Sequence, residues 1–275
     1  MTMMSYFNHR LRRLHRCNAV VQERSHNLGN LCNLWFLLFL SLSLVSCDSG
    51  DIVEGGYSVQ DKGKVVKLTA RVSGVGSWAN GYSVALAGFA KDDKYATMQR
   101  ALPVSTADGT DVTLTLNNIT EQISTVEFAI TDNLRKRIIT LGRIAMADYE
   151  DQQDTIRMDL GTIDLTMFGA LQQGLFNVAC IQCHGGNGRS AAGLDLTEGH
   201  ARENLVDVPS TRREGMMRVV SGDAPSSLLH QILSEGGEGI LGYNHTEVVS
   251  SQFKENAEEV RDLLDEWIGT LKVEN

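Results

Sequence analysis

Cysteine is scarce in this chain, and so are long apolar runs, and both shortages exclude structural classes. The 275 residues include five cysteines, three of them (Cys17, Cys32 and Cys47) within the first 47 residues. Only Cys180 and Cys183 follow, so the sequence predicts no disulfide framework. The uncharged apolar run over residues 34–46 is 13 residues long, whereas a helix that spans a bilayer needs about 20. The run is therefore too short to be expected to span a membrane as a permanent helix.

A surplus of positive charge is also missing. The net charge is −9, and it becomes −13 when the first 46 residues, with five arginines and one glutamate, are left out. This sign argues against nucleic acid or an anionic membrane surface as a direct partner, and it favours solubility or a basic protein partner. The content of 42% hydrophobic and 21% charged residues is typical of a globular protein.

The first 46 residues have the pattern of an export signal. Five arginines, with Glu23 as the single acid, precede the apolar run over residues 34–46. A basic segment followed by a short apolar segment is typical of a signal peptide. The expected destination is therefore outside the cytoplasm.

The run ends in Leu44-Val45-Ser46-Cys47, which resembles the lipobox of bacterial lipoproteins. The resemblance implies that Cys47 is lipidated and anchors the chain to a bacterial membrane, on its periplasmic side or on the outer-membrane surface. An ordinary signal peptide with a nearby cysteine is the alternative. Residues 47–56 are small, polar and acidic, as expected of a tether.

Residues 57–165 alternate between apolar and polar side chains, as half-buried strands do. The strand-like runs cover residues 66–72, 82–90, 112–116, 123–131, 137–145 and 156–160. Six to eight strands with turns between them predict a β-sandwich, similar in size to an immunoglobulin or fibronectin domain. The region has no cysteine and no histidine, and it shows no catalytic constellation. Trp78 could contact a ligand at a loop tip or cap the core.

Residues 166–275 have helical periodicity instead. An apolar series at helical spacing from Met167 runs directly into Cys180, and another from Val260 to Leu271 predicts an amphipathic C-terminal helix. Between them, Asp223-Ala224-Pro225 predicts a helix start with a capping acid and an early proline. The expected architecture is a β-sandwich followed by a small all-α domain.

The most specific motif is Cys180-Ile181-Gln182-Cys183-His184. This pattern attaches one c-type haem covalently, with Cys180 and Cys183 bonded to the two vinyl groups and His184 bound to the iron. A zinc site would need about four ligands, and no second cysteine pair exists. A thioredoxin-like pair would follow a strand and precede a helix, whereas here a helix is expected before the motif and glycines follow it.

Further motifs place residues 166–273 near a known family. They are listed in chain order: Gly193-Leu194-Asp195-Leu196, Asn204-Leu205-Val206, Gly222-Asp223-Ala224-Pro225-Ser226-Ser227-Leu228-Leu229 and Trp267-Ile268. The segment resembles class I-type bacterial cytochrome c domains, and within them the planctomycete-type subgroup found in lipoproteins. The resemblance implies an all-α haem domain in which Phe176 and Trp267 occupy the two aromatic packing positions of the first and last helices.

The chain departs from these relatives at the second iron ligand. The late Met-Pro segment common among them is missing, and His245 stands in the corresponding turn-like stretch, so we expect His245 to be the distal ligand. Met216 or Met217, or an open coordination position, are the alternatives. His230 is expected to point away from the apolar face of its helix, and His200 is expected to be exposed.

The expected function is that of a membrane-anchored c-type cytochrome that passes single electrons to a redox protein partner outside the cytoplasm, as a carrier rather than an enzyme. One alternative is a surface adhesion or binding lipoprotein whose β-sandwich recognises a ligand, which would need exposed aromatic residues. Another is a haem sensor or peroxidase-like protein with open iron.

Overall fold

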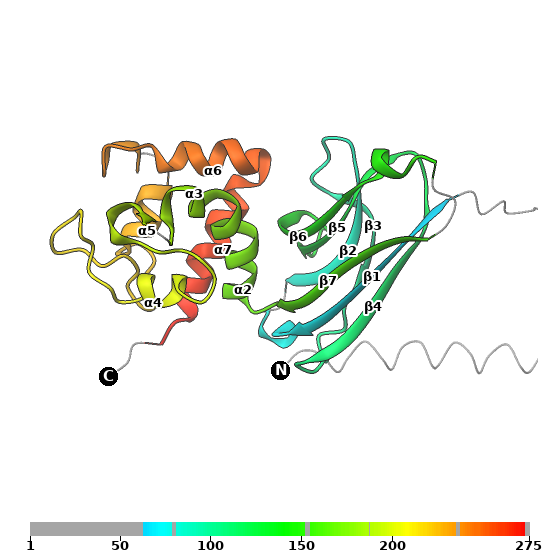
Figure 1. Ribbon diagram of the computed structural model, residues 1–275, viewed down its shortest axis with the longest axis horizontal. Coiled ribbons are helices and arrows are strands. Elements are labelled where there is room, and N and C mark those ends of the chain that lie inside the picture. The colour runs from blue at the N-terminus through cyan, green and yellow to red at the C-terminus, as the bar shows by residue number, and fades with distance from the viewer. Residues whose placement is uncertain (1–62, 79–80, 152–154, 187, 235–236, 273–275) are drawn as a thin grey trace, which may run out of the picture. The chain divides into compact units, whose positions relative to one another are not determined.

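The computed structural model describes residues 63–78, 81–151, 155–186, 188–234 and 237–272 (Figure 1). The predicted signal peptide (1–46), the lipidation site Cys47 and the tether (47–56) lie outside the described residues. Within the described part of the chain, no helix is both long and apolar enough to cross a membrane.

Seven strands form two sheets in the first half of the described chain. They are β1 (Lys64–Ser73), β2 (Tyr82–Ala90), β3 (Ala96–Ala101), β4 (Thr110–Ile119), β5 (Ile123–Asp132), β6 (Arg137–Ala145) and β7 (Ile156–Asp164). One sheet has the order β4-β1-β7 and the other β3-β2-β5-β6. Strands β1 and β7 pair in parallel, and the other pairs are antiparallel.

The alternation in the sequence accounts for most of these strands. In β1, buried Val66, Leu68, Ala70 and Val72 alternate with more exposed neighbours, because successive side chains of a strand point to opposite faces. Strand β3 was not anticipated. It is an edge strand with one buried residue, Ala96, so its sequence has little alternation to detect.

Apart from the two-residue strand β8 (Arg189–Ser190), the elements of the second half are helical, so the prediction of a β-rich region followed by a helical one is confirmed. The α-helices are α2 (Met167–Leu171), α3 (Ile181–His184), α4 (Ala201–Leu205), α5 (Leu228–Leu233), α6 (His245–Phe253) and α7 (Ala257–Thr270). A π-helix, η3 (Gln172–Cys180), lies between α2 and α3. Short 3-10 turns are η1 (Val75–Ser77), η2 (Met146–Tyr149), η4 (Ala191–Gly193), η5 (Gly237–Gly239) and η6 (Lys254–Asn256).

Local signals explain where several helices begin. Thr166 caps α2 by accepting a hydrogen bond from the Gly169 N–H, 3.0 Å away. Asp223 does not cap α5 directly: it accepts from the Ser226 N–H at 3.1 Å, and the helix begins later, at Leu228. The predicted start is therefore a turn that precedes the helix.

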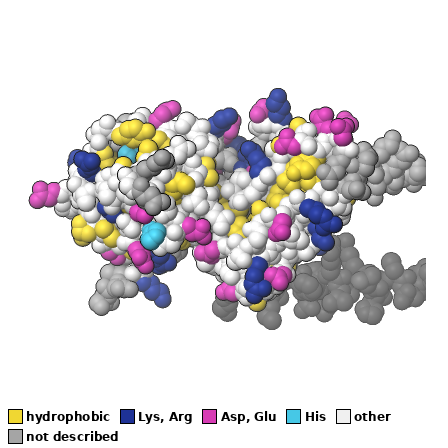
Figure 2. All heavy atoms as spheres, in the orientation of Figure 1, with side chains coloured by type: hydrophobic (Ala, Val, Ile, Leu, Met, Phe, Trp, Pro, Cys, Tyr) yellow, Lys and Arg dark blue, Asp and Glu magenta, His cyan; other side chains and the backbone are white. Residues whose placement is uncertain are grey.

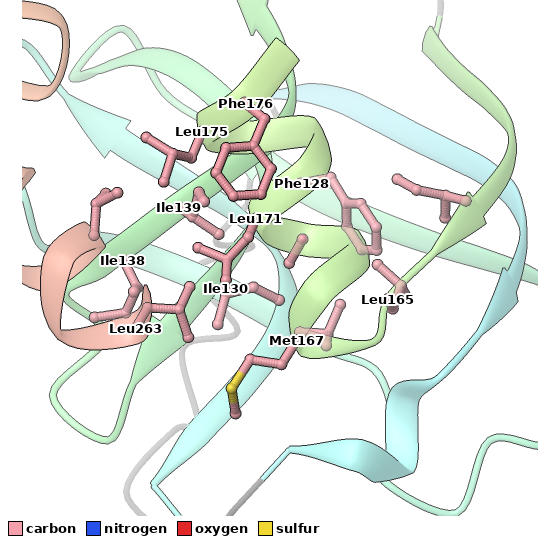
Figure 3. Close-up of a cluster of buried hydrophobic side chains, with 14 of the residues drawn as sticks. Phe128, Ile130, Ile138, Ile139, Leu165, Met167, Leu171, Leu175, Phe176 and Leu263 are labelled. Atoms are coloured by element: carbon pink, nitrogen blue, oxygen red, sulfur yellow. The ribbon is translucent and has the colours of Figure 1, made fainter. Parts of the chain in front are cut away.

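The β-rich and helical regions share one hydrophobic core. Figure 3 shows side chains of β5 and β6 packed against side chains of α2, η3 and α7. The approach is close at Gly174, where a Cβ atom would lie 2.3 Å from Ile139 Cγ1. Glycine at this position lets η3 lie directly against β6.

Polar contacts join the same two regions. The Tyr82 hydroxyl donates to Glu266 of α7 at 2.6 Å, and the Asn256 side chain donates to the Arg137 carbonyl at 3.0 Å.

Trp78 is buried, with 8% of its surface exposed, and its indole N–H donates to the Leu165 carbonyl at 2.7 Å. Trp78 is thus a core residue and not a ligand contact at a loop tip.

Candidate functional site

A mostly apolar cleft in the helical region is lined by Cys180 and His184 of the cysteine–histidine motif, whereas Cys183 is exposed and is not among the lining residues. Cys180, His184 and His245 line it, and so does a set of aliphatic side chains: Leu194, Leu196, Leu205, Leu228, Leu229, Ile232, Leu233 and Leu241. On the face shown in Figure 2, yellow hydrophobic side chains gather beside a histidine in the helical region, and charges of both signs are intermixed elsewhere. Apolar walls with a few polar groups are typical of a ligand pocket.

His184 and His245 both line this cleft, and their rings lie close together and nearly parallel. Their ring centroids are 6.3 Å apart, and the ring planes differ by 23°. In each ring Nδ1 contacts a backbone carbonyl: that of Ala191 at 3.0 Å for His184, and that of Tyr243 at 3.2 Å for His245. A carbonyl can only accept a hydrogen bond, so these contacts favour the tautomer with the proton on Nδ1, in which Nε2 carries the lone pair that can bind a metal ion.

Burial disfavours the charged form of both imidazoles. Burial lowers the pKa of His184 below its usual value, and the nearby His245 lowers it further, although the Ala191 carbonyl acts in the opposite direction. Burial also lowers the pKa of His245, opposed by the Tyr243 carbonyl. A neutral imidazole is the form that binds a metal ion.

The helix that carries the motif has an unusual local structure. η3 runs as a π-helix through Cys180, and α3 continues it to His184. Such wide helical turns are rare and occur often at functional sites. Gly185 follows because a Cβ atom there would lie 2.5 Å from the Ile181 carbonyl oxygen, so a larger residue would not fit against α3.

His245 is placed by the start of α6. It is the first residue of this helix, and the preceding Asn244 caps it by accepting from the Glu247 N–H at 2.9 Å. The next residue, Thr246, is buried and donates to the Ser234 carbonyl at 2.9 Å. The sequence predicted a turn here, whereas the histidine lies at a capped helix end that is anchored to the segment after α5.

The two cysteines of the motif differ in exposure. Cys180 lines the cleft, and burial raises the pKa of its thiol to about 12. Cys183 is exposed, and both thiols are free. A reactive redox thiol needs a lowered pKa, so Cys180 does not have the character of a thioredoxin-like nucleophile.

The other candidate ligands lie outside the cleft lining. Met217 is 40% exposed, and Met216 packs against the core. His230 is engaged elsewhere, with its Nδ1 2.7 Å from Asp265 Oδ1 of α7. His200 is exposed, as predicted. Among the sequence candidates for an iron ligand, the structure brings His245 alone to His184.

Two residues near the site were missed by sequence reasoning. The ring of Phe168 lies between the two predicted aromatic positions, with its centroid 6.0 Å from that of Phe176 and 5.0 Å from that of Trp267. Arg218 lines the cleft and is buried, with 8% of its surface exposed. An arginine between Met217 and Val219 has no sequence pattern that marks it as buried.

The described residues hold no group of three or more His, Cys, Asp and Glu side chains arranged to bind a metal ion. A zinc site of the usual kind, with about four protein ligands, is therefore not formed by this part of the chain. Comparisons of the chain with protein-family models, with curated proteins and with solved structures found no match.

Proposed function

We propose that this chain is a c-type cytochrome that carries one covalent haem in the cleft between His184 and His245. In this proposal Cys180 and Cys183 would hold the haem through thioether bonds, and the two histidines would bind its iron. The helical region is then a class I-type cytochrome c domain, of the planctomycete-type subgroup that its motifs resemble. The observation that carries the proposal is the pair of neighbouring imidazoles in a cleft that Cys180 also lines.

The spacing of the two rings fits a metal ion between them. If each Nε2 binds a metal at about 2.0–2.1 Å, the range for imidazole on zinc, two coaxial rings would have centroids about 6.4 Å apart. The observed separation is 6.3 Å. This separation is compatible with a shared metal ion, and the two rings are nearly parallel, with planes that differ by 23°.

The number of protein ligands fits as well. Two imidazoles are too few for a metal held by protein alone, but they complete the coordination of an iron whose other four donors are the nitrogens of a porphyrin. The aliphatic walls suit the faces of such a macrocycle. Because the free volume between them is small, about 80 Å³, these walls must separate when a macrocycle enters.

When bound, a haem supplies an iron centre that gains and loses one electron. The residues of this chain set the conditions for that exchange. The Ala191 and Tyr243 carbonyls orient the two imidazoles and increase their basicity. The aliphatic shell excludes water, and a pair of imidazoles lowers the potential relative to a His-Met pair, since a thioether ligand raises it.

The rest of the chain has a supporting role in this proposal. The two sheets form an immunoglobulin-like or fibronectin-like sandwich, and lipidation of Cys47 anchors the chain to a bacterial membrane outside the cytoplasm, where a redox protein is the partner. The adhesion alternative relied on exposed aromatic residues around Trp78. Trp78 is only 8% exposed, so it does not supply such a contact.

The first test is covalent haem attachment. The full chain, exported in a host with a haem-ligation system, should show a pyridine haemochrome spectrum of c-type haem and a haem-stained band on a denaturing gel. A Cys180→Ser/Cys183→Ser variant should lose the stained band, and His200→Ala, which replaces an exposed histidine, should keep it. Absence of covalent haem from the exported wild-type protein would refute the proposal.

The second test concerns the iron ligand. The reduced wild-type protein should not bind carbon monoxide, because both axial positions are filled, and His245→Ala should bind it. His230→Ala, which replaces a histidine paired with Asp265, is the matched control and should behave as the wild type. Carbon monoxide binding by the wild type would favour the open-iron alternative.

A further inference from the structure

A second pocket, with a volume of about 320 Å³, lies between strands β2, β5 and β6 and the end of α6. Its lining contains more basic than acidic side chains. The basic ones are Lys91, Lys94, Arg137, Arg143 and Lys254, and the acidic ones are Asp92, Asp93 and Glu255. The chain as a whole has a net charge of −9, so the surplus of positive charge is a feature of this pocket and not of the protein.

The buried carboxylate of Glu127 holds the two arginines of this pocket. Arg143 donates to its Oε1 through Nε at 3.0 Å and through Nη2 at 2.8 Å, and Arg137 Nε lies 3.0 Å from its Oε2. The hydroxyls of Thr125 and Thr140 donate to the same carboxylate at 3.0 and 2.7 Å. Glu127 is thus surrounded by donors, and its one negative charge faces two guanidinium groups.

This arrangement leaves guanidinium donors unused. Among the described residues, Nη1 of Arg137 and Nη1 of Arg143 have no hydrogen-bond partner, whereas Arg137 Nη2 donates to the Asp93 carbonyl at 3.1 Å. Arg137 Nε is buried and, although close to Glu127, is not aligned for a hydrogen bond. Burial lowers the pKa of Arg137, and Glu127 opposes this only in part. The charge of Arg137 is therefore incompletely compensated.

The plane of the Arg137 guanidinium is also fixed. The ring of Phe89 lies against it, with its centroid 4.2 Å from Arg137 Cζ, a contact that arginine forms readily with aromatic faces. A guanidinium that is stacked on one side and held by a carboxylate loses little freedom when a ligand binds. The two arginines are therefore preorganised for an anion.

Lys254, on the α6 side of the pocket, has a strained backbone. Its φ is 50° and its ψ is −119°, a region that glycine occupies without strain and other residues rarely adopt. Strain of this kind is often kept at ligand-binding sites. Lys254 forms no ion pair within the described part of the chain, so its ammonium group is available to a ligand.

We propose that this pocket binds a phosphate group, either as the free ion or as the ester of a small organic molecule. The unused donors of Arg137 and Arg143 bind its oxygens, and Lys254 adds a charge from the α6 side. A phosphate suits these donors better than a carboxylate does, because more of its oxygens can accept from separate directions. The lining shares no residue with the cleft at Cys180, so the inference does not rest on the proposed function.

The test is calorimetric titration of the full chain with inorganic phosphate and with glycerol phosphate, at an ionic strength held constant with sodium chloride. The wild type should bind at least one of them with a Kd of about 1 mM or lower, and acetate at least about tenfold more weakly. Arg143→Gln should weaken phosphate binding by about tenfold or more, because it removes a charged donor fork. Arg157→Gln, which replaces an exposed arginine of β7 outside the pocket, is the matched control and should leave the affinity within about twofold.

Lys254→Gly separates a ligand role from a structural one. It relieves the backbone strain and removes the ammonium group, so it should weaken phosphate binding by about threefold or more without lowering stability. A gain in stability with unchanged phosphate affinity would overturn the role of Lys254. Failure of the wild type to bind either phosphate compound, or equal affinity for acetate, would overturn the proposal whether or not any variant folds.

Discussion

Replacing Gly174 with alanine would test the contact that joins the helical region to the sheet. The new Cβ would lie 2.3 Å from Ile139 Cγ1 and 2.6 Å from Cδ1, with the Thr140 carbonyl oxygen at 3.2 Å. Overpacking of a core costs about 1–3 kcal/mol, whereas glycine to alanine inside a helix gains about 0.5–1 kcal/mol. Because the contact is so short, we expect an overpacking cost in the upper part of its range, and therefore a net decrease of about 2 kcal/mol in the free energy of unfolding.

The measurement is equilibrium unfolding in urea, repeated in an Ile139→Ala background. Ile139→Ala alone should cost about 2–5 kcal/mol, but it removes both carbon atoms that the new methyl group would meet. Gly174→Ala should therefore cost at least about 1 kcal/mol less in that background, an interaction within the usual range for residues in contact. Strict additivity of the two substitutions would refute the described packing of η3 on β6.

A matched control is available in α7. Gly269 is exposed, and a Cβ atom there would meet nothing within 4 Å. Gly269→Ala should leave stability unchanged or raise it by up to about 1 kcal/mol. If Gly269→Ala were as destabilising as Gly174→Ala, the loss at Gly174 could not be assigned to the contact with Ile139.

Three further predictions concern polar groups. Trp78→Phe leaves a buried carbonyl without its 2.7 Å donor and should lower the free energy of unfolding by about 1–3 kcal/mol, as thermal and urea unfolding would show. Glu127→Gln removes a fully buried charge whose oxygens lie 2.8 and 3.0 Å from two arginines. The free energy of unfolding is expected to fall by about 3–5 kcal/mol, and an unfolding midpoint equal to that of the wild type would contradict this. The Ser221 hydroxyl and N–H lower the pKa of Asp207, so this pair stabilises the fold above the unfolded pKa of about 3.9 and ceases to do so as the pH falls through the folded value. The stability difference between wild type and Ser221→Ala should accordingly be largest near neutral pH and smallest near about pH 2.

The strands and the last helix could be predicted because each pattern is local. The alternation of Val66, Leu68 and Val72 requires a half-buried strand, and the apolar stripe of Val260, Leu264 and Trp267 requires one buried helical face. The π-helical winding before Cys180 could not be predicted, because an apolar series at helical spacing does not distinguish a wide turn from an ordinary one.

The cysteine–histidine motif, on which the proposed haem chemistry depends, could be found from the sequence alone, since Cys180, Cys183 and His184 are neighbours whose spacing is itself the signal. Only the tertiary structure places the ring centroid of His245 6.3 Å from that of His184. It alone also places Arg218 beside the same cleft, with no acidic partner among the described residues. These contacts join segments that are distant in the sequence and that meet through the packing of α5, α6 and η4. A local sequence pattern does not report how close two such segments come in the folded chain.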